Sequence, residues 1–400
     1  MSHKIIFILS ILLSSATLAL GQAPEPQPPP APAAERLTLE QAIDIALQDN
    51  RPMKNARLEL DNYQDRLAGL KTKRLPSFKV SSLVAQPLTG FDLTFEKGTF
   101  GTFASTGPIP NEDTTISSSM KPTALVTGQI TQPLSQLYRI KLNIEQMKLS
   151  REISREDLRL KQQAVVNDVK RAYYAVLQTQ SAFESAETSV KLYQEIERVT
   201  EDYVMQQAAL KTEQLQVQEQ LARAEYQLLT LQNQLASQKE QLNNLLGRDV
   251  RTEFSVTDGV EVAQVVMRET DLSAARERAL AQRPEINAAR LRIGQAKYDK
   301  RIKKSEYLPD VSISANYVSP FGFSSVLPTN IASVGIQVEW EVFDWGRKKR
   351  EMAEKQRGIE QAGSSLRETE NQVLMDVNNQ FRKLQESYQL LRIARMSQET

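Results

Sequence analysis

The sequence predicts a mainly α-helical protein with a small β part, in which one arrangement of helices and strands occurs twice. Landmark residues recur in order: Leu75-Pro76 returns as Leu308-Pro309, and a second set returns further along, with Leu158, Asp168, Val169 and Tyr173 matched by Leu366, Asp376, Val377 and Phe381. No Gly or Pro interrupts the chain between Leu134 and Leu246, as is typical of long helices. Repeats this long indicate an architecture rather than a catalytic motif.

Composition narrows the functional classes. The chain has 50 Lys and Arg against 49 Asp and Glu, so it has no net field to attract nucleic acid. Aromatic residues make up only 6% of the chain, whereas Gln, Glu, Leu, Ala and Lys are abundant, which favours long helices over a large enzyme core. Cys is absent, and this excludes disulfides, thiolate sites and an acylated cysteine anchor.

The N-terminus resembles a secretory signal. Lys4 precedes an apolar run from Ile5 to Leu20, and small residues follow. We expect a signal peptide at 1–21 and an extended, proline-rich linker at 22–36. The alternative is an uncleaved anchor, although the run is near the lower limit for spanning a bilayer.

Short helices open both copies. Residues 37–49 form an amphipathic pattern in which Thr38 and Gln41 are placed as a capping box, and residues 271–282 repeat it. Arg51-Pro52 and Arg283-Pro284 follow, and proline at a first helical position starts a further helix in each copy. We expect these second helices to end near Arg74 and Tyr307.

Alternating segments predict four strands. Two are expected near 78–86 and 123–134. Two clearer ones are expected at 311–318 and 333–342, where apolar and polar residues alternate along the strand. A soluble sandwich would show this alternation too. The signal peptide and the Trp residues at 340 and 345 favour an outer-membrane β-barrel instead.

A barrel assigns the two faces of these strands. The polar residues are then predicted to line a bore, namely Ser312, Ser314, Asn316, Gln337 and Glu339. The apolar residues are predicted to face lipid, namely Val334, Ile336, Val338, Trp340 and Val342. Four strands cannot enclose a water-filled bore, so the chain must oligomerise.

The uninterrupted run after Pro133 predicts a coiled-coil hairpin. Apolar residues keep a heptad spacing from Val165 to Tyr193 and again, in a second frame, from Val217 to Leu245. The seam thins between the frames, so we expect the hairpin to turn near 206–212.

Enzymatic constellations are missing from the sequence. It has no glycine-rich phosphate loop and no metal-ligand spacing, and its one histidine, His3, lies in the predicted signal peptide. We therefore predict no enzymatic activity, no cofactor and no metal. Basic clusters at 71–74, 300–304 and 347–350 fall where helices meet strands, where they are either solvated helix ends or a collar facing membrane headgroups.

These residues together resemble a known family. Residues 37–47, the two Arg-Pro helix starts, the two Leu-Pro pairs and the strand exit at 342–347 are similar to the TolC-type outer-membrane efflux proteins. The resemblance covers nearly all of 37–400. It implies a homotrimer with a twelve-stranded barrel in the outer-membrane lipid and a helical tunnel in the periplasm. It also implies that the protein is the exit duct of an efflux pump or a type I secretion system. The implied partners are a periplasmic adaptor and an inner-membrane pump.

The resemblance also implies a contact site at the hairpin tip. The family pattern places Tyr203, Gln207 and Glu213 there, with Gln207 in the place of a glycine. The predicted adaptor contact comprises Tyr203, Gln207, Ala208, Ala209, Leu210, Lys211, Thr212 and Glu213.

The repeats define the expected domains. The first spans 37–248, a linker spans 249–270, and the second spans 271–400 without the returning part of its hairpin, where family gates commonly lie. Two alternatives to the duct stay open at this stage: a non-channel periplasmic adaptor or structural protein, and a periplasmic enzyme. The tandem copies disfavour the adaptor, which usually has one hairpin between compact domains.

Overall fold

A computed structural model describes residues 35–90, 92–117, 122–257, 269–322 and 330–399. The predicted signal peptide at 1–21 and all but the last two residues of the predicted linker at 22–36 lie outside the described residues.

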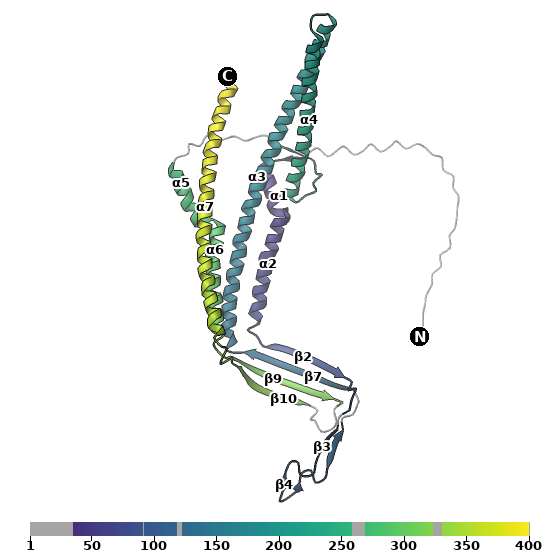
Figure 1. The fold of residues 1–400 in the computed structure, drawn as a ribbon, viewed down its shortest axis with the longest axis vertical. Helices are drawn as coiled ribbons and strands as arrows, with labels where there is room; N and C mark the ends of the chain where they lie inside the picture. Colours follow the sequence, from purple (N-terminus) through teal and green to yellow (C-terminus); the bar gives the residue numbers. More distant parts are fainter. Residues whose placement is uncertain (1–34, 91, 118–121, 258–268, 323–329, 400) are drawn as a thin grey trace, which may run out of the picture.

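Seven helices in the described chain make up an elongated body above a small sheet (Figure 1). Helix α3 alone has 70 residues and is therefore roughly 105 Å long at 1.5 Å per residue. It packs against α2, α4 and α6, while α7 packs against α5 and α6. The helices are α1 (Leu39–Asp49), α2 (Arg51–Thr72), α3 (Gln136–Met205), α4 (Lys211–Leu246), α5 (Glu269–Gln282), α6 (Pro284–Ser305) and α7 (Arg347–Glu399). The mainly helical fold and the long hairpin confirm the predicted fold class.

Four antiparallel strands form the main sheet in the order β10-β9-β7-β2. They are β2 (Ser77–Ala85), β7 (Thr123–Pro133), β9 (Asp310–Phe321) and β10 (Ile331–Glu339). The two copies thus contribute one strand pair each, joined at the β7–β9 ladder. The outer strands β2 and β10 have no strand partner on their free edges within the described chain.

The connection between the two strands of the first copy is longer than that of the second, and it forms small hairpins between β2 and β7. Strands β3 (Asp92–Phe95) and β6 (Thr114–Ser117) pair with each other, as do β4 (Thr102–Phe103) and β5 (Gly107–Pro108). They extend beyond the end of the sheet that lies away from the helices (Figure 1). The sequence predictions above include no strands in this connection.

The main core lies halfway along the helices. Side chains of α1, α3 and α4 pack there against a parallel pair of short strands, β1 (Glu35–Leu37) and β8 (Phe254–Val256). The Tyr173 hydroxyl donates to the Leu37 carbonyl oxygen at 2.9 Å and accepts from the Thr257 backbone N–H at 3.3 Å. Strand β8 falls inside 249–270, which the sequence predicts only as a linker.

Helix ends hold this core in register. The predicted capping box is confirmed, because Gln41 N–H donates to the Thr38 hydroxyl and Thr38 N–H donates to the Gln41 side chain. Helix α4 ends at Gly247, whose φ of 76° is left-handed, and an added Cβ would lie 2.3 Å from the Asp49 carbonyl oxygen. Glycine is therefore required where α4 meets the α1–α2 joint.

The predicted heptad seams are confirmed. On α3, the buried residues include Val165, Val169, Val176, Ala186 and Val190. On α4, residues of the second frame are half-buried or buried, while most residues between them are exposed. This burial is the expected result of knobs-into-holes packing in the α3–α4 hairpin.

Candidate functional site

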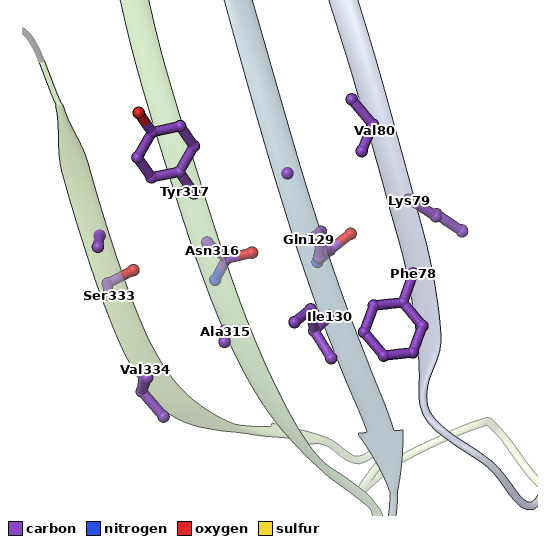
Figure 2. A pocket seen from close by; sticks show the side chains of 12 residues that line it. Phe78, Lys79, Val80, Gln129, Ile130, Ala315, Asn316, Tyr317, Ser333 and Val334 are labelled. Atoms are coloured by element: carbon purple, nitrogen blue, oxygen red, sulfur yellow. The ribbon is translucent and has the colours of Figure 1, made fainter.

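The four-stranded sheet has one polar and one apolar face. Strand register places residues in rows across all four strands, and Figure 2 shows three successive rows. The middle row is polar and consists of Lys79, Gln129, Asn316 and Ser333. The rows on either side are largely apolar: Phe78, Ile130, Ala315 and Val334, then Val80, Gly128, Tyr317 and Ala332. Because adjacent residues of a strand point to opposite faces, polar and apolar rows separate onto the two sides.

The residues predicted to line a bore share the polar face. Gln337 pairs with Ser312, and Asn316 pairs with Ser333, so β9 and β10 contribute to one surface. Glu339 lies two residues after Gln337 and therefore on the same side. Strands β2 and β7 extend this surface, where the hydroxyls of Ser81 and Thr127 are 2.7 Å apart. The alternation in β2 and β7 is weaker, so the predicted bore residues include none from these two strands.

The apolar face is exposed in the single chain. Val334 is 79% exposed and Ile336 is 72% exposed, so neither is covered by this chain. Three predicted lipid-facing residues, Val334, Ile336 and Val338, lie on this face. The predicted extent of the strand was wrong: β10 ends at Glu339, so Trp340 and Val342 lie in the segment that leads to α7.

That segment turns sharply into α7. Trp345 has a φ of 55°, and Gly346 has a φ of 82°. The Asp344 carboxylate accepts from the backbone N–H groups of Gly346 and Lys348, which lowers the pKa of Asp344. Lys348, which is almost fully buried, donates to the Glu341 carbonyl oxygen at 3.0 Å. Local hydrogen bonds and one glycine therefore fix the passage from sheet to helix.

The hairpin tip lies at the opposite end of the body. Helix α3 ends at Met205 and α4 begins at Lys211, which confirms the predicted position of the turn. Gln207 has a φ of 58°, so it takes the left-handed conformation that glycine adopts at no steric cost. Leu210 N–H donates to the Glu213 carboxylate at 3.4 Å. Of the predicted contact residues, Ala209 is half-buried and the others are exposed.

Among the described residues, no group of three or more His, Cys, Asp or Glu side chains could hold a metal ion. None of the helices that the structure describes is both long and apolar enough to cross a membrane.

Comparison with known proteins agrees with this geometry. The family model described as outer membrane efflux protein matches residues 42–248 and 275–400. A curated but uncharacterised protein of Haemophilus influenzae is 21% identical over 216 residues. That alignment covers 52% of this chain and 47% of the relative, so it spans about half the length of that protein.

Solved structures share the fold at low identity. A membrane protein from Pseudomonas aeruginosa is 16% identical with a TM-score of 0.68, over 93% of this chain and 83% of that one. The Campylobacter jejuni outer membrane channel CmeC is 15% identical with a TM-score of 0.64, over 90% and 76%. The Vibrio cholerae outer membrane protein VceC is 15% identical with a TM-score of 0.61, over 90% and 81%.

Proposed function

Because the chain belongs to the outer membrane efflux protein family, we propose that it forms the exit duct of an efflux or secretion system. The observation that carries this proposal is the two-faced sheet, whose polar rows continue across four strands while the opposite apolar face lies uncovered. In an outer membrane, lipid covers the apolar face and water fills the space behind the polar face. The helical body then lies in the periplasm.

Closure of the duct requires more than one chain. All three ladders of the sheet are antiparallel, so β2 and β10 run in opposite directions. The edge strand β10 of one chain can therefore pair with β2 of a neighbouring chain. Such head-to-tail contacts close into a ring and leave no free edge. We propose that three chains together form a ring of twelve strands, as in the family that the sequence resembles.

Single cysteines can test which face lines water, since the natural chain has none. Purified full-length Gln337→Cys protein in planar bilayers is expected to conduct ions, and a charged, membrane-impermeant thiol reagent should reduce or alter that current. Ile336→Cys is the matched control, because its side chain lies one residue away on the opposite face. A current that both variants lose equally, or no current at all, would contradict the duct.

We also propose that the hairpin tip contacts a periplasmic adaptor that is coupled to an inner-membrane pump. Tyr203, Met205 and Leu210 are all more than half exposed there, and they give the turn an apolar surface that no part of the described chain covers. Apolar anchors at the end of a projecting hairpin are typical of a protein–protein contact.

A pair of substitutions tests the tip. Leu210→Glu is expected to weaken co-purification of the adaptor, because a carboxylate would enter an apolar contact. Leu229→Glu makes the same change at a comparably exposed residue of α4, roughly 28 Å along the helix. Equal loss in both variants, or no loss in either, would remove the tip from the contact.

A further inference from the structure

A basic groove lies where the helices meet the sheet, and the proposed duct does not use it. Its walls come from the first turns of α3 and α7 and from the end of α6 with the residues that follow. It is lined by Tyr138, Arg301, Lys304, Tyr307, Leu308 and Lys349, among others. Three cations thus surround a surface made of two tyrosine rings and a leucine.

These cations differ from their neighbours in pairing. Lys303 binds Glu306 at 2.7 Å and Glu351 at 2.8 Å, and Lys348 lies 3.4 Å from Glu341. Arg301, Lys304 and Lys349 are exposed, and none of them is paired with a carboxylate in the part of the chain that the structure describes. Lys303 and Lys348 are therefore engaged by carboxylates, whereas the three cations that line the groove, Arg301, Lys304 and Lys349, are free to bind an anion.

The groove opens on the apolar side of the sheet. Gln136, at the start of α3, borders a different hollow whose strand residues lie mostly on the polar face: Ser77, Thr131, Pro133 and Ser312 belong to that face, and Phe78 belongs to the apolar one. Tyr138 is two residues further on and therefore about 200° around the helix, on the opposite side. The basic groove is thus at the level where the apolar face ends, on the side that lipid would cover.

We propose that this groove binds the phosphate headgroup of an anionic phospholipid in the periplasmic leaflet. The cations supply charge complementarity, and Tyr138 and Tyr307 provide rings suited to the bilayer interface. Leu308, which is 55% exposed, offers a surface to the first part of an acyl chain. The inference rests on the membrane placement proposed above, and it adds a ligand that the duct itself does not require.

Lipid retention tests this proposal directly. Full-length protein is exchanged into mixed micelles of phosphatidylglycerol and phosphatidylethanolamine, and the lipids that remain bound are counted by native mass spectrometry. The wild type is expected to retain phosphatidylglycerol preferentially. An Arg301→Gln, Lys304→Gln, Lys349→Gln triple variant should lose that preference. The ratio of retained phosphatidylglycerol to phosphatidylethanolamine should fall about fivefold for each cation removed. If the triple variant does not assemble, Lys304→Gln and Lys349→Gln alone should each lose part of it.

The matched control removes three cations at the end of α2, outside the groove. Lys71→Gln, Lys73→Gln, Arg74→Gln changes the net charge equally and is expected to keep the lipid preference. Equal loss in both triple variants would indicate general charge attraction and overturn the site. If inorganic phosphate stabilises the folded protein as strongly as phosphatidylglycerol does, the lipid assignment would also be overturned. Unchanged bilayer conductance in the groove variant would show that a failure concerns the lipid site and not the duct.

Discussion

The sheet and the helical core place the same kinds of side chain in opposite surroundings. In the core, Leu242, Leu246 and Phe254 are at most 1% exposed, because helices and strands of the same chain cover them. In β10, Val334 and Ile336 are more than 70% exposed. Both regions follow the regular spacing of their secondary structure. Apolar periodicity therefore predicts which face leaves water, but it does not say whether protein or lipid covers that face.

The largest loss of stability is expected in the helical core, where protein buries the apolar side chains. Leu246→Ala would leave a cavity at the end of α4, in the buried core that α4 shares with α1 and α3, and should lower the free energy of unfolding by roughly 2–5 kcal/mol. Guanidinium unfolding followed by helical circular dichroism measures this loss. Leu229→Ala, an exposed site on the same helix, should change stability little, and a similar loss there would show that the core does not dominate helix stability.

The next prediction tests whether lipid covers the apolar face of the sheet. Ile336→Arg places a charge on the apolar face and should cost about 2–4 kcal/mol if the site lies near the bilayer midplane. The expected result is loss of the folded oligomer on unheated detergent gels. Gln337→Arg on the polar face should assemble normally and change ion selectivity. Tolerance of arginine at both positions would mean that the apolar face does not meet hydrocarbon.

Two tyrosines sharpen the comparison further. Tyr173→Phe removes a buried hydroxyl that bridges the Leu37 and Thr257 backbone, and should cost roughly 1–2 kcal/mol. Tyr317→Phe removes a hydroxyl that is 2.6 Å from the Asn330 side chain at an exposed site, and should cost less. Thermal unfolding of the two variants side by side checks the order. A larger loss for Tyr317→Phe would reverse it.

The smallest effect concerns pH at the junction between sheet and helices. Hydrogen bonding to Arg347 lowers the pKa of Glu341, and hydrogen bonding to Lys303 lowers the pKa of Glu351, both from 4.5. A lowered carboxyl pKa stabilises the fold above pH 4.5, and this contribution disappears as the pH falls through the lowered value. Trp340 and Trp345, the only tryptophans, flank the junction, so their fluorescence should change below pH 4.5 before the helical circular dichroism does. Glu351→Gln should shift this change, and simultaneous loss of both signals would contradict a local transition.

Much of the fold was predictable because its patterns are local. The capping box at Thr38, the Arg-Pro helix starts and the heptad seams depend on residues within a few turns, and the structure confirms them. The pairing of β1 with β8 was not predictable, because it joins short segments far apart in the sequence. The end of β10 was missed because alternation continues into Trp340 and Val342, whereas the ladder stops at the Glu339–Asp310 pair, where the partner strand β9 begins.

The candidate site was predictable only in part, for a related reason. Alternation in β9 and β10 was enough to assign their faces, and strand register then added Lys79 and Gln129 from the weaker copy. At the tip, the heptads located the turn, but only the backbone shows that Gln207 takes up the left-handed conformation itself. The basic groove combines three helix ends, and no single stretch of sequence shows which of its cations are paired.

The order of strands in the sheet limits how wide a tube built from this chain can be. Each copy brings the whole set β10-β9-β7-β2, with edges that run in opposite directions and match only head to tail. The circumference therefore changes in steps of one whole chain, never by a single strand or hairpin. Fine adjustment of the diameter is left to strand tilt, and coarse adjustment would demand a different number of subunits.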